Sequence, residues 1–425
     1  MLNKMKLIIP FAAVLVSELA FADEIPPSRW VIDVPKGNYL ETFEHVSAID
    51  DKWAGYRRTA KSWVYAVLGD ERLALSSIWD MEDLSYSEVI AELSRHPSEI
   101  CKEMGYEDIC WSDGFSAVRE LAHGNRLVFV NEGHHMSRHR TFLEALLPDL
   151  WKMGYRYLAV EALDEKTIEA LQKNEPMPLT QSFYLHDPQF ANMLRTAHAL
   201  GFVLVAYEQT GEQMKGCANC SPREVSLKRE KDQSENLYNK TFLQDTDAFV
   251  VAYGGFGHIY KCRRQREDGT FIETTATLLN KKLDGQMVSI NQTENYISGI
   301  SNIEFTDKKN VTVFAFPGDD CVDLKLSHDI SEEVAETQRW RGWIKSREKV
   351  TLSMKNDNLK YPILLEVYNS SFSPEQKTVP VDRVTLWEPG TGHLWAPKEG
   401  EAHFYALTSD GQRLTLEPSL NPIQE

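Results

Sequence analysis

The stretch from Leu127 to His139 reads LVFVNEGHHMSRH, an apolar run that ends in a cluster of polar residues. The run Leu127–Val130 has the length and composition of a buried strand. Directly after the cluster, Arg138–Met153 carries apolar side chains at helical spacing on one face, and Gly154 follows as a helix stop. The stretch therefore predicts a strand, a polar turn and a helix in immediate succession.

The same order of apolar run and polar end recurs along the middle of the chain. The further runs are Tyr157–Val160, Phe202–Ala206, Ala248–Tyr253 and Met287–Ile290. Amphipathic segments of helical length separate them, and this β-α-β repetition predicts an α/β fold with a mostly parallel central sheet flanked by helices. Because parallel strands all point one way, the residues just past each strand meet along one edge, where open α/β folds bind ligands.

The segments around these runs have other patterns. Ala54–Leu121 carries apolar residues at helical spacing and predicts a helical layer, which we assign with the sheet to a core over residues 23–300. Residues 301–348 read as a linker and a helix at Ser331–Lys345. Residues 349–425 hold short β-like runs separated by turn residues, which predicts a small, sandwich-like β-rich domain.

Residues 1–22 have the order of a secretory signal peptide. Two lysines precede the apolar run Leu7–Val16, and Ala20-Phe21-Ala22 stands before Asp23. The run is about half as long as a membrane span requires, and no later segment is long and apolar enough to span a membrane. We expect a cleaved signal, no transmembrane segment after cleavage, and a periplasmic or secreted protein.

The chain is acidic, with a formal net charge of -17 over 425 residues. Removing the expected signal takes away two lysines and Glu18, which moves the charge to -18. Nucleic-acid binding needs clustered basic surface, so this class of partner is excluded. A small-molecule or peptide substrate is the expected partner.

The six cysteines form an even set in an exported chain, so disulfides are expected. Their connectivity cannot be deduced from the sequence. Cys217 and Cys220 form a C-x-x-C pair, which is a redox or zinc motif in other settings. Because it follows a strand in a loop and has no second C-x-x-C, we predict a local disulfide there.

The densest chemical cluster lies at a strand-to-helix turn, where a stretch of eight residues holds Glu132, His134, His135 and His139. Imidazoles and a carboxylate at short spacing can hold a metal ion, or they can form a general base tuned by the carboxylate. Consecutive residues point to opposite sides, so we expect one of His134 and His135 to face the site and the other to face away. The sequence does not decide which one.

Further polar groups follow the other strands. Glu161 ends a nearly continuous apolar run, so its burial requires a cationic or imidazole partner, and its strand is expected to neighbour the first. Glu208 repeats the pattern, with a structural role as the alternative. His258 follows the glycine-rich Gly254–Gly257, where it is expected to act as a base, an acid or a metal ligand.

Arg229 and Asn236 lie two turns apart on one face of a polar helix predicted over Arg223–Phe242. An arginine there can hold a substrate carboxylate or stabilise an oxyanion. A solvated helix face is the alternative reading of the same spacing.

Four motifs in chain order resemble the superfamily that joins erythromycin esterases to the ChaN haem-binding lipoproteins and the TIKI metalloproteases. They are Asn131–Arg138 (NEGHHMSR), Tyr157–Glu161 (YLAVE), the set Arg229, Glu230 and Asn236, and Gly257-His258. The resemblance covers about residues 120–295 and leaves the tail after residue 349 outside it.

The resemblance implies different roles by branch. In the esterases a histidine three positions after the first glutamate acts as base on a water that opens a macrolactone, and His135 has that spacing. In the ChaN branch the histidine falls two positions after the glutamate and another follows five residues later, as His134 and His139 do. Arg229, Glu230 and Asn236 match the esterase helix that carries Arg-Asp/Glu and a later Asn.

Two hypotheses follow. The first is an exported hydrolase that activates water for cleavage of an ester, lactone or amide. In it Glu132, His134, His135, Glu161 and His258 are the catalytic candidates, and Arg229, Asn236, Glu208 and His139 are the substrate-binding candidates. A divalent metal (Mn, Zn or Co) would be held by His134, Glu161 and His258. The second is a non-enzymatic haem- or metal-binding protein of the cell envelope.

Overall fold

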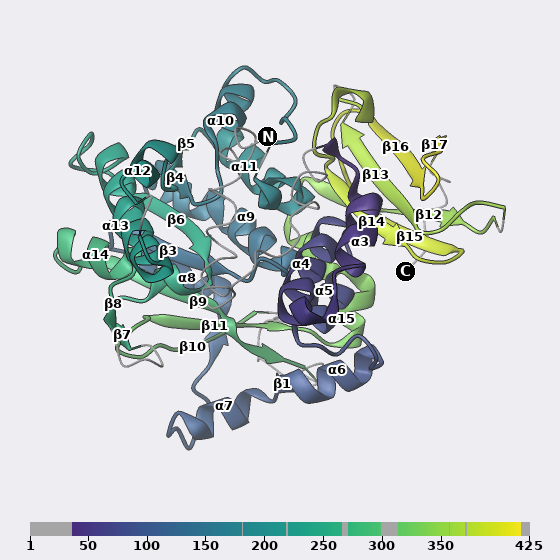
Figure 1. Cartoon of the computed structure of the whole chain (residues 1–425). Helices are drawn as coiled ribbons and strands as arrows, with labels where there is room; N and C mark the ends of the chain where they lie inside the picture. Colours follow the sequence, from purple (N-terminus) through teal and green to yellow (C-terminus); the bar gives the residue numbers. More distant parts are fainter. Residues whose placement is uncertain are drawn as a thin grey trace.

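In the computed structural model one large mixed sheet organises the chain. The structure describes residues 36–180, 182–217, 220–265, 271–298, 313–356, 358–369 and 372–417. The strand order is β2-β10-β11-β9-β3-β6-β4-β5, and the short β1 pairs with β9 (Figure 1). Six neighbouring strands, from β11 to β5, run parallel. The predicted α/β class is confirmed.

The five predicted strands all form and supply most of the parallel set. The parallel strands are β3 Leu127–Glu132, β4 Tyr157–Val160, β5 Val203–Ala206, β6 Val250–Gly255, β9 Met287–Ile297 and β11 Leu324–Asp329. Side chains alternate between the two faces, so Val128 and Val130 enter one apolar core while Leu127 and Phe129 enter another. The sheet is therefore covered on both sides, as expected for parallel strands.

The sheet continues past residue 300, where the sequence predicted only a linker and a helix. Strand β10, Val313–Pro317, runs antiparallel between β11 and the short β2, Ser112–Asp113. The single helix predicted over 331–345 is interrupted, because Gln338 adopts φ 46° between α15, Glu332–Thr337, and the 3-10 turn η6, Arg339–Trp343.

Helices cover the two faces of the sheet. The first face packs on α4, α8, α9 and α11, and the second on α13 and α14. The helical layer predicted over Ala54–Leu121 is present as α4 to α8, and α3 precedes it. The helices are α3 Tyr39–Ser47, α4 Ala54–Val67, α5 Glu71–Ile78, α6 Tyr86–Leu93, α7 Pro97–Glu103, α8 Gly114–Ala122, α9 Ser137–Lys152, α10 Glu165–Gln172, α11 Pro188–Leu200, α12 Gly211–Lys215, α13 Pro222–Lys240 and α14 Thr275–Lys282.

The C-terminal segment forms two small antiparallel sheets around a core of their own, as predicted. In one sheet β12, Arg347–Met354, pairs with β15, Gly390–Pro397, which the sequence did not predict. The other has the order β14-β13-β16-β17, and Figure 1 shows both beside the large sheet. Its strands are β13 Ile363–Asn369, β14 Asp382–Leu386, β16 Ala402–Thr408 and β17 Arg413–Leu416.

All six cysteines are paired. The disulfides join Cys101 to Cys110, Cys217 to Cys220 and Cys262 to Cys321, so the predicted local bridge is confirmed. Such bridges persist in oxidising compartments. Among the described helices none is long and apolar enough to cross a membrane. The predicted signal peptide lies outside the described residues.

Candidate functional site

The polar ends of the parallel strands meet at one edge of the sheet, as the sequence predicted. The strand that carries Glu161 does not neighbour the first strand, however, because β6 lies between them. Glycine makes this arrangement possible. A Cβ on Gly254 would lie 2.5 Å from Tyr207 Oη and 3.1 Å from Glu161 Oε2, and one on Gly255 would lie 2.6 Å from the His134 ring. The two glycines let side chains from both neighbouring strands approach across β6.

Glu132 fixes His134 through a buried network. Its Oε1 lies 2.7 Å from His134 Nδ1, and both of its oxygens accept hydrogen bonds from Arg140, at 2.7 and 2.9 Å. Arg140 also pairs with Asp187 at the start of α11 and donates to the backbone oxygen of His134 at 2.9 Å. The side chains of Glu132, His134, Arg140 and Asp187 are all buried. Burial makes an unpaired charge costly, and in this network each charge has a direct partner.

The protonation of this pair follows from its charges. Burial opposes ionisation of Glu132, but Arg140 and His134 outweigh it and lower the pKa of the carboxyl to about 2. An ionised carboxylate accepts hydrogen bonds only, so His134 Nδ1 carries a proton and a neutral ring leaves Nε2 as an acceptor. The ring stacks on Tyr184 with centroids 4.0 Å apart and meets Trp63 edge-on. This packing fixes the direction of Nε2.

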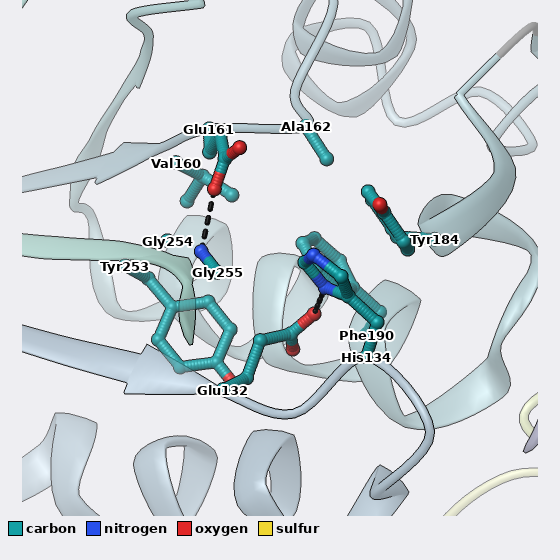
Figure 2. Close-up of a pocket in the computed structure, with 10 residues that line it drawn as sticks. All are labelled: Glu132, His134, Val160, Glu161, Ala162, Tyr184, Phe190, Tyr253, Gly254 and Gly255. Atoms are coloured by element: carbon teal, nitrogen blue, oxygen red, sulfur yellow. Dashed lines mark hydrogen bonds and ion pairs between the residues drawn. The ribbon is translucent and has the colours of Figure 1, made fainter. Parts of the chain in front are cut away.

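Glu161 faces the same space from the other side of β6. Its Oε2 accepts a hydrogen bond of 2.5 Å from Gly255 N, and its Oε1 accepts one of 2.5 Å from Arg229 Nη2. Figure 2 shows the Glu132–His134 pair and Glu161 around one pocket, with Tyr184 and Phe190 on its wall. The pocket has a volume of about 10 Å³, roughly the space of one water molecule.

His258 adds a positive charge next to Glu161. Its Nε2 lies 3.4 Å from Glu161 Oε1 and its Nδ1 lies 2.9 Å from Glu230 Oε1. Burial opposes protonation, but Glu230 and Glu161 outweigh it and raise the pKa of His258 to about 10. The ring is therefore an imidazolium at neutral pH. Of the three roles predicted for His258, the charge favours the acid over the base and the metal ligand, and it adds an electrostatic role that was not predicted.

Arg229 is already engaged by carboxylates of the protein. Besides Glu161, it binds Glu208 through Nε at 3.0 Å and Nη2 at 2.6 Å, while Nη1 lies 3.3 Å from His258 Nε2. Arg229 therefore has no free pair of N–H donors for the predicted contact with a substrate carboxylate. Asn236 donates to the backbone oxygen of Glu208 at 2.9 Å and so fixes the end of β5. Both helical residues reach the sheet edge, so the solvated-face alternative is wrong.

The other two histidines of the turn lie elsewhere. His135 is buried and lines a second, larger cavity, where its Nε2 lies 3.3 Å from Tyr296 Oη. Burial, with the neighbouring His134 and Arg140, lowers the pKa of His135 to about 3. His139 accepts a hydrogen bond from Gly133 N at 3.0 Å and packs on His328, so it supports the turn and lines neither pocket.

The residues predicted to bind a metal ion or haem are not arranged to hold either one. Among the described residues no group of three His, Cys, Asp or Glu side chains is placed to hold a metal ion. His258 is protonated, and both it and Arg229 already pair with Glu161, so two cations occupy the carboxylate of the proposed set. His134 is packed between aromatic rings beside a pocket too small for a porphyrin. No chemical step is therefore assigned to a metal or to haem.

Four residues at the site were not among the predicted site residues. Arg140 lies one turn into α9, Asp187 and Tyr184 follow a long connection, and Glu230 was noted only as part of the resemblance. The run Ser137-Arg138-His139-Arg140 carries a signal for Arg140, since a helix next to a buried carboxylate needs a cation. Nothing in the local sequence marks Tyr184 or Asp187.

No protein-family model and no curated protein matches the chain. Among solved structures, the type III effector HopBA1 has a TM-score of 0.29 and 13% identity, over 51% of this chain and 91% of that one. RRSP, a MARTX toxin effector domain from Vibrio vulnificus, has a TM-score of 0.28 and 12% identity, over 68% and 51%. The C-terminal region of Pasteurella multocida toxin, described with a thiol-protease-like catalytic triad, has a TM-score of 0.31 and 10% identity, over 85% and 54%. Likeness at this level carries no argument about function.

Proposed function

We propose that this chain is an exported hydrolase, of the erythromycin-esterase/ChaN-like type that its motifs resemble, which activates water to cleave an ester, lactone or amide. The observation that carries the proposal is the pocket of about 10 Å³ that His134 and Glu161 line together. It holds a base aligned by Glu132, a carboxylate and room for one water, with cationic groups next to the carboxylate. The three disulfides support export.

Each residue has a distinct role in this reaction. His134 Nε2 takes a proton from the water while Glu132 stabilises the imidazolium that forms. The hydroxide oxygen bonds to the carbonyl carbon, and the carbonyl π electrons move to the oxygen. His258 and Arg229 offset the negative charge of Glu161, so the oxyanion forms beside a carboxylate whose charge is compensated. The carbon–heteroatom bond then breaks, and the leaving group takes the proton from His134.

Hydrolysis of a panel of esters, lactones and amides by the mature chain tests the proposal. We expect His134→Ala and His258→Ala to lose roughly 10² to 10⁴ of kcat/KM without unfolding. His123→Ala is the matched control, because His123 is exposed at the end of α8. Full activity in His258→Ala would remove that residue from the mechanism.

The metal content of the same samples distinguishes this hydrolase from the second hypothesis, a haem- or metal-binding protein. Stoichiometric manganese, zinc or cobalt that disappears in His134→Ala would replace the proposed chemistry with a metal-dependent one. Iron with a Soret band would indicate a haem binder instead.

A further inference from the structure

A second, larger cavity lies beside the candidate site and is separate from the one-water pocket. It has a volume of about 500 Å³, within the range of sites that hold small ligands. The N-terminal helical layer supplies one wall and the sheet edge the other. The lining residues are Gly55, Tyr56, Arg58, Thr59, Ile78, Trp79, His135, Phe256, Thr293 and Tyr296.

One ring of the cavity wall, Phe256, contacts a histidine of each space. It meets His134 edge-on with centroids 5.4 Å apart and lies nearly parallel to His135, with centroids 6.3 Å apart. His134 faces the one-water pocket and the next residue, His135, lines the larger cavity. Because these two histidines are consecutive, a substrate whose scissile bond reached His134 would have a neighbouring group close to this cavity.

The cavity wall is aromatic and almost without charge. Tyr56, Trp79, Phe256 and Tyr296 contribute four rings, and Trp79 and Phe256 remain 50% and 41% exposed. The one charged lining residue, Arg58, pairs with Asp80 at 3.1 Å, and both side chains are open to solvent. Exposed rings around a concave space favour a flat apolar group over an ion.

The wall also carries a polar group with unused capacity. His135 is 3% exposed, and its Nδ1 is buried without a hydrogen-bond partner among the residues that the structure describes. Its pKa of about 3 keeps the ring neutral, so it neither attracts nor repels an ion by charge. Buried polar atoms normally have partners, so the His135 ring keeps unused hydrogen-bonding capacity next to the cavity that it lines.

We propose that this cavity binds a neutral aromatic group of the substrate, preferably one that carries a hydrogen-bonding substituent such as a phenol. The assignment deepens the proposed hydrolase function and rests on it for the position of the scissile bond. Within the cavity the ring would contact Trp79 and Phe256, and its substituent would reach the pair formed by His135 and Tyr296.

Ligand-observed NMR on the mature chain tests the pocket without requiring turnover. The probes are N-acetyl-tyrosinamide, N-acetyl-phenylalaninamide and N-acetyl-alaninamide. A side chain added at Gly55 enters open space, because no atom lies within 4 Å of its Cβ position. Gly55→Phe therefore fills the cavity entrance, and Gly55→Ala is the matched control.

We expect the tyrosine probe to bind the wild type and Gly55→Ala, with a Kd roughly tenfold or more higher in Gly55→Phe. His135→Phe should abolish a preference of roughly fivefold for the tyrosine over the phenylalanine probe. Equal binding to Gly55→Phe, equal binding of the alanine probe, or no binding of any aromatic probe would overturn the assignment. Probe binding without any hydrolysis would instead refute the proposed function and leave the pocket standing.

Discussion

Gly255 is the position where a single methyl group tests the geometry of the site. Its φ of -76° and ψ of 154° are open to any residue, so alanine brings no backbone strain. The added Cβ would lie 2.6 Å from Cε1 and Nε2 of His134 and 3.5 Å from Glu161 Oε2. Tyr184 stacks on the His134 ring at 4.0 Å, so displacement of that ring disturbs a packed pair.

Two magnitudes follow for Gly255→Ala. Overpacking of a buried site costs about 1–3 kcal/mol of unfolding free energy. A base displaced by about 1 Å loses roughly 100-fold in rate. We therefore expect kcat/KM to fall about 100-fold while the chain still folds, as measured by steady-state hydrolysis and urea unfolding.

The matched control is Gly216→Ala. Gly216 has φ -67°, and its added Cβ would meet its nearest neighbour, Gln213 O, at an ordinary 3.7 Å. This variant should keep wild-type kcat/KM. Wild-type kcat/KM in Gly255→Ala as well would refute the placement of the active base against β6.

Three further perturbations give separate outcomes. Glu132→Gln leaves buried Arg140 without its full charge partner and should cost about 3–5 kcal/mol in urea unfolding; a cost under about 1 kcal/mol would contradict the buried ion pair. The pKa of His258 is raised in the fold to about 10, so its stabilising contribution is complete below the unfolded value of about 6.5 and is lost as pH rises through 10. The Tm difference between wild type and His258→Gln should accordingly shrink over that window, and a constant difference would argue against the raised pKa. Replacing both Cys262 and Cys321 with serine opens a bridge with a sequence separation of 59 and should cost about 4 kcal/mol, which calorimetry would detect; an unchanged Tm would show that the bridge adds no stability.

The parallel sheet followed from the sequence because burial on both faces leaves continuous apolar runs, which are easily recognised. Strand β10 has the same kind of run, Val313–Phe316, but it stands in a segment that had been assigned to a linker. Strand β15 reads GTGHLWAP, where two glycines and a terminal proline hide the strand pattern. Strand order was the harder part, since pairing of β6 between β3 and β4 depends on tertiary packing.

The site was predictable where residues end strands and unpredictable where distant segments close it. Glu132 ends a strand, and Glu161 and His258 come just after strands. Because these strands are parallel, the three residues converge at one edge of the sheet. Tyr184 and Asp187 arrive through a connection whose path the local sequence does not encode. The direction of His134 and His135 also needed the structure, because aromatic packing around each ring decides which pocket it faces.

Chemical rescue of His134→Gly tests most directly whether His134 is the base that activates water. Removing the ring leaves a slot between Tyr184 and Gly255 of the shape of imidazole. We expect the variant to lose at least roughly 100-fold in kcat/KM, and added imidazole to restore part of it in a concentration-dependent way. A variant that stays active without imidazole, or an inactive folded variant that imidazole does not rescue, would show that His134 is not this base.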